Sequence, residues 1–217
     1  SETVWRQADR YGVPRFCFIN KLDRTGADFW HVVDMIRDRL GAAAVPVQIP
    51  IGIEDKFRGV IDLLEMQAIT YGNDLGDSIE VGEIPAEYVE QATAGRDKLV
   101  EALADLDDGI AHSYLEGEQI DAATLRRGLR AGTLGYKIVP VLCGSALKNK
   151  GVQPMLDAVI QYLPSPLDVE AVTGTDPRNG EQTTRHTDPA EPFTALAFKI
   201  AADPYVGKLA FFRVYSG

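Results

Sequence analysis

The feature that most constrains the fold is a pair of short apolar runs, each followed by a polar turn and then an amphipathic helix pattern. The first run covers residues 15–19 and the second covers residues 137–143. Both are rich in β-branched or aromatic side chains, which is typical of strands buried on both faces of a sheet. Strand, turn and helix in this order form the unit of α/β folds, so the two segments predict an α/β fold with an open parallel sheet.

The helix that follows each strand is predicted from hydrophobic periodicity. Apolar residues recur at helical spacing over residues 29–40, and Gly41 marks the end of that helix. Thr25 and Asp28 have the spacing of a capping box at its start. A second series with the same spacing is stopped by Pro164, and its predicted buried face consists of Val152, Met155, Leu156, Val159, Ile160 and Leu163.

The segment between the two units has a different character. Alternating apolar residues over residues 45–71 predict two to four strands with a turn near residues 54–59. Residues 72–85 are rich in Gly, Pro, Asp and Glu and predict a loop. Residues 86–132 predict acidic helices, one of them capped by Asp121.

The last part of the chain is polar at first and then turns apolar. Residues 166–191 predict a linker, and residues 192–217 predict two strands joined across residues 204–207. These strands look like the opening hairpin of a β-barrel or sandwich. The sequence starts without Met inside a helix pattern and stops at the end of a strand pattern, so we expect it to be a piece of a longer protein.

Composition excludes several classes of function. Lys and Arg total 22 against 32 Asp and Glu, a net charge of −10 that argues against broad, non-specific nucleic-acid binding. No run of about 18 apolar residues is present, so we expect no membrane partner. The two cysteines form no disulfide framework, which fits a cytoplasmic protein. The three histidines lack metal-ligand spacing, so we expect no metal site.

Two polar motifs follow the two predicted strands. Residues 20–23 read Asn-Lys-Leu-Asp, and residues 144–146 read Gly-Ser-Ala. Ligands of an open parallel sheet bind at the carboxyl ends of its strands, so both motifs are placed to meet one ligand.

The chemistry of these residues suits guanine. The Asp23 carboxylate can accept from N1–H and the 2-amino group together, a strong bidentate pair that adenine cannot form. The backbone N–H of Ala146 can donate to O6, and Asn20 can bond the base and tie the two motifs together. The aliphatic stem of Lys21 can lie along the base. Ser145 can orient Asp23 by a hydrogen bond.

A purely structural interpretation competes with this one. The string over residues 20–23 occurs by chance in many chains, and it is also an ordinary polar turn in which Asp23 or Thr25 caps a helix. Its position directly after a buried strand, together with the Ser-Ala strand end downstream, favours nucleotide binding.

The motifs also resemble those of a known family. Residues 20–23 look like the fourth signature of translational GTPases, and residues 144–146 look like the fifth. The long insertion between them is characteristic of the bacterial-type elongation factor G family. Leu147 stands where that family leads us to expect an aromatic residue. The flanking stretches that carry the resemblance are residues 12–15, 23–29, 143–152, 162–166 and 211–217.

The resemblance implies a domain map. Residues 1–44 and 136–165 would be parts of a P-loop GTPase-type domain, and residues 45–135 an inserted α+β subdomain. Residues 166–191 would be the linker, and residues 192–217 the start of a β-barrel domain. The acidic helices of the insertion either face the ribosomal stalk or form a solvated surface.

The resemblance further implies a GTPase that promotes ribosomal translocation of tRNA and mRNA. Its partners would be ribosomal stalk proteins, ribosomal RNA and a guanine nucleotide, GTP or GDP. The implied base-binding residues are Asn20, Lys21, Asp23, Ser145, Ala146 and Leu147.

The sequence contains no G-x-x-x-x-G-K-[ST] phosphate loop. We therefore expect no catalytic residue in this chain, Mg²⁺ ligands outside it, and weak nucleotide binding by the chain alone. Two alternatives stay open. One is a ribosome-binding module with a vestigial nucleotide pocket, and the other is a related ribosomal-protection or release-factor GTPase.

Overall fold

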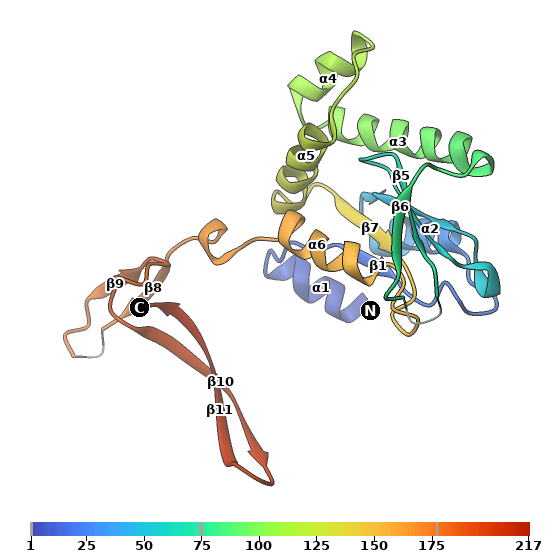
Figure 1. Cartoon of the computed structure of the whole chain (residues 1–217). Coiled ribbons are helices and arrows are strands. Elements are labelled where there is room, and N and C mark those ends of the chain that lie inside the picture. The colour runs from blue at the N-terminus through green and yellow to red at the C-terminus, as the bar shows by residue number, and fades with distance from the viewer. Residues whose placement is uncertain (1, 74–75, 177) are drawn as a thin grey trace. The chain divides into compact units, whose positions relative to one another are not determined.

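Figure 1 shows the computed structural model of the chain, which describes residues 2–73, 76–176 and 178–217. The chain divides into two units, residues 1–163 and residues 164–217. Small parts of the segments predicted above fall on residues 1, 74, 75 and 177, which lie outside the described residues.

A three-stranded parallel sheet lies at the centre of the first unit. Strands β1 (Cys17–Ile19) and β2 (Ala44–Pro46) both pair with β7 (Val139–Cys143), which lies between them. Ile19 is in register with Cys143, so β1 and β7 end level with each other. The α/β fold with a parallel sheet is therefore confirmed. Strand β2 was not predicted as part of this sheet.

Helices precede and follow these strands. Helix α1 (Glu2–Arg10) leads into β1, α2 (Phe29–Leu40) connects β1 to β2, and α6 (Val152–Tyr162) follows β7. The predicted end of α2 is confirmed, because Gly41 takes a left-handed conformation with φ of 63°.

The predicted capping box at the start of α2 is wrong. Asp28 itself is the N-cap, and its Oδ1 accepts from the N–H of His31 at 3.0 Å. The chain turns twice before it enters the helix, since Arg24 N–H donates to Lys21 O and Ala27 N–H donates to Arg24 O. Thr25 lies inside these turns, three residues too early to cap α2.

A four-stranded antiparallel sheet follows β2. It consists of β3 (Gln48–Ile51), β4 (Gly59–Asp62), β5 (Gln67–Tyr71) and β6 (Ile79–Gly82), in that order, and a 3₁₀ turn, η1 (Glu54–Lys56), connects the first two. The sequence predicted a loop where β6 lies. All four residues of β6 are exposed, and its alternation is limited to Ile79 and Val81 within a stretch rich in Gly, Pro, Asp and Glu, so the strand was not recognised.

Val47 joins the two sheets. Its N–H donates to Val141 O of β7 at 3.0 Å, and its carbonyl accepts from Leu63 N, just after β4, at 3.0 Å. The parallel and antiparallel sheets are therefore linked by backbone hydrogen bonds as well as by side-chain packing.

The predicted acidic helices are confirmed. A short turn, η2 (Ala86–Tyr88), leads into α3 (Val89–Ala104), and α4 (Asp108–Leu115) and α5 (Ala122–Leu134) follow. Asp121 caps α5 as predicted, because its Oδ1 accepts from the N–H of Thr124 at 2.6 Å. Among the described residues, no helix is long and apolar enough to cross a membrane.

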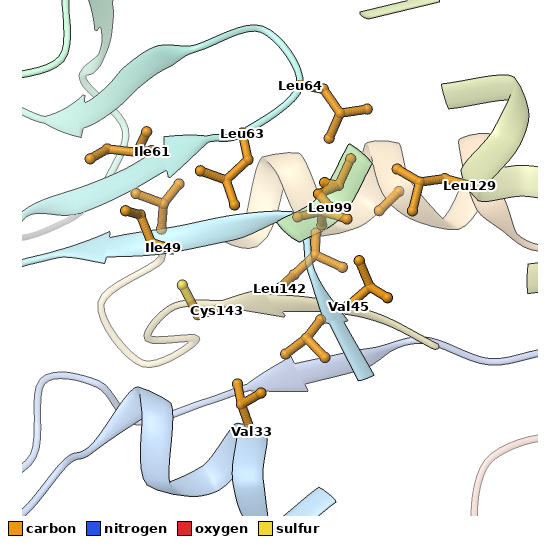
Figure 2. Packing of buried hydrophobic residues seen from close by; sticks show 14 of the residues in the cluster. Val33, Val45, Ile49, Ile61, Leu63, Leu64, Leu99, Leu129, Leu142 and Cys143 are labelled. Carbon is orange, nitrogen blue, oxygen red and sulfur yellow. The ribbon is translucent and has the colours of Figure 1, made fainter. Parts of the chain in front are cut away.

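One apolar core joins these elements. Figure 2 shows side chains from both sheets converging with side chains of the helices. The labelled residues are Val33, Val45, Ile49, Ile61, Leu63, Leu64, Leu99, Leu129, Leu142 and Cys143, and all of them are buried. The antiparallel sheet, helices α3 to α5 and the parallel sheet thus share one core rather than forming separate ones.

The buried face of α6 differs from the predicted one. Ala158 and Tyr162 are buried, one helical turn apart, whereas Leu156 and Ile160 are 56% and 78% exposed. The helix itself is confirmed, but apolar periodicity alone did not identify which side contacts the core.

The second unit consists of short elements and two hairpins. A turn, η3 (Pro166–Asp168), precedes the hairpin of β8 (Val172–Thr175) and β9 (Gln182–Arg185). This hairpin lies in the predicted linker, and its polar, mostly exposed residues explain why no strand pattern was visible. The predicted hairpin at the end of the chain is confirmed as β10 (Thr194–Asp203) and β11 (Gly207–Ser216).

Candidate functional site

The ends of β1 and β7 bring the two polar motifs together. Gly144 N–H donates to Ile19 O at 3.0 Å, and Leu22 N–H donates to Gly144 O at 3.2 Å. We call residues 20–27 the first loop and residues 144–151 the second loop. Because β1 and β7 are parallel neighbours, both loops leave the sheet at the same edge.

Gly144 is required by the close approach of its neighbours. A Cβ at this position would lie 2.4 Å from Lys150 O and 2.7 Å from the Phe18 ring. Only glycine lets the second loop fold back over β1 at this distance.

Asn20 ties the two loops together. Its Oδ1 accepts from the backbone N–H of Lys21 at 2.8 Å and of Ala146 at 2.9 Å. This confirms the predicted link between the motifs. It also changes the expectation for Ala146, whose N–H was assigned to guanine O6 but already has a partner in Asn20. A base at this site has to share or displace that hydrogen bond.

The surroundings of Asp23 keep its carboxyl group in the charged form, which accepts hydrogen bonds. Its side chain is 13% exposed and is hydrogen-bonded to the side chain of Ser145, as predicted. That hydrogen bond is the main cause that holds the pKa of the Asp23 carboxyl below its usual value, with a smaller contribution from Arg24, whose Nε lies 3.9 Å from Oδ2. The carboxylate is therefore ionised at neutral pH.

Ser145 is buried, and both its side chain and its backbone are hydrogen-bonded. Its Oγ accepts from the N–H of Lys148 at 3.3 Å, which leaves its hydroxyl proton to donate to Asp23. Its backbone forms a two-way bridge with Lys150, with N···O distances of 2.8 and 3.0 Å. The position of Ser145 is thus set by backbone geometry.

Lys21 and Leu147 lie on the exposed side of the two loops. Lys21 has a φ of 67° and an exposed side chain. Leu147 is 74% exposed, so its apolar side chain is uncovered at the start of the second loop. Both side chains are accessible to a ligand that reaches Asp23.

Sequence reasoning missed the residues that hold these loops from the antiparallel sheet. Glu54 N–H donates to Leu22 O at 2.7 Å, and Glu54 Oε1 accepts from Gly26 N at 2.6 Å. The Tyr71 hydroxyl accepts from Gly151 N at 2.7 Å. The Glu54–Gly26 and Tyr71–Gly151 pairs are separated by 28 and 80 positions in the sequence, so no local pattern could have indicated them.

The two cysteines have no role in the chemistry of this edge. Burial raises the pKa of Cys17 to about 11 and also raises the pKa of Cys143, so both thiols stay protonated at neutral pH. They act as apolar strand residues, as predicted.

The donor set does not fit a metal ion. Within residues 2–73, 76–176 and 178–217, no three His, Cys, Asp or Glu side chains cluster in a way that could hold a metal ion.

Comparison with known proteins decides the family. Residues 1–165 match the family model described as the elongation factor Tu GTP binding domain. The chain belongs to this family. The matched range includes both strand-end motifs, so the edge formed by Asn20, Asp23 and Ser145 lies within a GTP-binding domain of the elongation factor type.

This elongation factor GTP-binding domain also resembles a solved structure. A crystal structure of a protein from Thermus thermophilus matches it with a TM-score of 0.77 and 29% sequence identity. The similarity covers 100% of this chain and 29% of the other, so the chain spans less than a third of the length of that relative.

Proposed function

We propose that this chain forms the guanine-recognition edge of a translational GTPase of the elongation factor G type. The observation that carries the proposal is the ionised Asp23, held by Ser145 at the edge where Asn20 bonds Ala146. Family membership supports guanine nucleotide binding in general. The long insertion and the flanking stretches named above support the elongation factor G type.

Base recognition follows from the charges and partners at this edge. The Asp23 carboxylate accepts from guanine N1–H and from the 2-amino group at the same time. Charge-assisted bidentate pairs are among the stronger and more selective hydrogen bonds. Adenine offers no such pair of donors, so the carboxylate discriminates between the two purines.

Asn20 and Ala146 would bind the base on the side of O6, away from the 2-amino group. Both hydrogen bonds to Asn20 Oδ1 come from backbone N–H groups, so the amide nitrogen of Asn20 remains the group that can donate to the base. The N–H of Ala146 donates to O6 by sharing its bond to Asn20. Lys21 contributes its aliphatic stem along the ring plane, and the exposed Leu147 covers the base from the second loop.

GTP hydrolysis needs groups that this chain lacks. The sequence contains no phosphate-binding loop, and phosphate contacts supply a large part of nucleotide affinity. We propose that the 217 residues alone neither hydrolyse GTP nor bind GDP tightly, and that the Mg²⁺ ligands lie in other parts of the natural protein. In that protein, hydrolysis would drive tRNA and mRNA translocation on the ribosome, in the cytoplasm.

The domain map is part of the same proposal. Residues 1–44 and 136–165 would belong to the GTP-binding domain, and residues 45–135 to its inserted subdomain. Residues 166–191 would connect it to a β-barrel that begins within residues 192–217. The acidic helices α3 and α4 would face ribosomal stalk proteins, and ribosomal RNA would be a further partner.

The alternative is a ribosome-binding module with a vestigial pocket. One observation favours it, since the Ala146 N–H expected to bind O6 is already bonded to Asn20.

Competition between nucleotides in the natural protein that carries these residues separates the two functions. The proposal expects GDP to bind at least about 100-fold more tightly than ADP, and about tenfold more tightly than IDP, which lacks the 2-amino donor. Equal affinities for GDP and ADP would rule out guanine recognition and favour the binding module.

A further inference from the structure

We propose that the antiparallel sheet β3–β6 positions both base-binding loops, with Tyr71 and Glu54 as its contact residues. The inference rests on the proposed function, since it concerns the same edge. It assigns a role in nucleotide binding to residues that lie outside both strand-end motifs. They are positioning residues, because they contact the loops rather than the base.

Tyr71 lies at the end of β5 and holds the second loop. It is buried, and its hydroxyl accepts from Gly151 N at 2.7 Å and donates to Gln153 Oε1 at 3.1 Å. Gly151 is also buried, so its N–H needs a partner inside the protein. The Tyr71 hydroxyl therefore closes the second loop at the point where α6 begins.

The chain after β5 lies directly against the same loop. The carbonyl of Gly76 accepts from Asn149 Nδ2 at 3.2 Å and from Gln153 Nε2 at 3.4 Å. Gln153 also donates to Asn149 Oδ1 at 3.1 Å, which closes the network. Asn149 has a φ of 52°, a left-handed conformation that these side-chain bonds help to hold.

Gly76 shows how close this approach is. It is buried, and a Cβ at this position would lie 2.5 Å from the carbonyl oxygens of both Lys148 and Asn149. Its φ of 65° adds a second reason for glycine. A side chain here would push the second loop away from the sheet.

Glu54 lies in the turn between β3 and β4, at the same end of the sheet as Tyr71, and holds the first loop. Its backbone N–H donates to Leu22 O at 2.7 Å, and its side chain accepts from Gly26 N at 2.6 Å. Leu22 is buried and lies between Lys21 and Asp23. Anchoring Leu22 therefore fixes the backbone position from which the Asp23 side chain extends.

One ladder connects these anchors. Ile51 pairs with Gly59 in β4, and Gly59 pairs with Thr70, the neighbour of Tyr71. Glu54 and Tyr71 are thus extensions of one hydrogen-bonded sheet, and each holds a different loop. The sheet therefore fixes the distance between the Glu54 contact to the first loop and the Tyr71 contact to the second loop. Preorganisation of this kind improves both affinity and selectivity.

The test compares Tyr71→Phe with Tyr114→Phe in the natural protein that carries these residues. Both changes remove one hydroxyl, but Tyr114 is exposed on α4 and bonds Glu101 at 2.9 Å, far along the chain from either loop. We expect Tyr71→Phe to speed hydrogen exchange of residues 145–151 at least about fivefold and to weaken GDP binding about five- to tenfold. The preference for GDP over IDP should fall as well, which a general loss of stability would not cause. Tyr114→Phe should change none of these more than about twofold.

A second variant keeps the test decisive if Tyr71→Phe folds poorly. Gln153→Leu keeps the Tyr71 bond to Gly151 but removes the acceptor of the Tyr71 hydroxyl and the bonds to Gly76 and Asn149, and it should move the same measurements in the same direction. Folded variants with unchanged exchange and unchanged GDP-to-IDP preference would overturn the inference. If the unsubstituted protein does not prefer GDP over ADP, the proposed function fails, and hydrogen exchange of residues 145–151 still decides whether the sheet positions the loop.

Discussion

Asn20 Oδ1 accepts a hydrogen bond from the backbone N–H of Ala146 at 2.9 Å, across 126 positions of the sequence. This one bond joins the loops that follow β1 and β7. It gives the edge of the parallel sheet a defined shape before any ligand binds, and it makes the two motifs one site rather than two turns.

Asn20→Ala should separate the two loops. The substitution removes the acceptor shared by Lys21 and Ala146, and we expect a loss of about 1–2 kcal/mol in the free energy of unfolding, measured by urea denaturation. GDP affinity should fall more than about tenfold. Asn179→Ala, in the exposed turn of the β8–β9 hairpin, is the control and should change neither value.

Asp23→Asn should alter which base is accepted. An amide accepts only one of the two guanine donors, but its NH₂ group can donate to the 2-oxo group of xanthine. We expect the preference of the natural protein for GTP over XTP to fall or reverse in a competition assay. Unchanged selectivity would remove the role assigned to Asp23.

The contribution of Asp23 to stability should depend on pH. Its folded-state pKa lies below the ordinary aspartate value because Ser145 donates to the carboxylate. A lowered pKa stabilises the fold above the unfolded-state pKa, about 3.9, and this stabilisation is lost as the pH falls through the folded-state value. The difference in unfolding free energy between the protein and Asp23→Asn should therefore narrow as the pH falls from about 6 to about 3. A constant difference over that range would contradict the hydrogen bond to Ser145.

Gly144→Ala should strain the second loop. The new methyl group would meet Lys150 O at 2.4 Å and the Phe18 ring at 2.7 Å, so the loop or β1 has to shift. Overpacking of this kind costs about 1–3 kcal/mol, which thermal and urea unfolding can measure. Gly82→Ala is a matched control, because a Cβ at Gly82 meets nothing within 4 Å. Equal stability of the two variants would mean that the second loop is looser than the structure shows.

Local patterns in the sequence were sufficient for much of the fold. The apolar runs predicted β1 and β7, the helical spacing predicted α2 and α6, and Gly41 and Asp121 marked helix ends where the structure has them. Strand-end placement brought Asn20 and Ser145 to the same edge. Each of these features depends on residues within one or two turns of the chain, which is why the sequence alone reveals them.

Other features were decided only by tertiary structure. The β8–β9 hairpin is polar and mostly exposed, and strand β6 has only the exposed Ile79 and Val81 as an alternating pair, so neither carries a strand pattern long enough to predict. The buried side of α6 depended on what packs against it. At the site, the occupied N–H of Ala146 and the anchors Glu54 and Tyr71 depend on contacts between distant segments. The sequence by itself therefore determined which residues stand at the ends of the strands, and the packing of the antiparallel sheet against both loops decided how they are held, because that geometry exists only once the chain has folded.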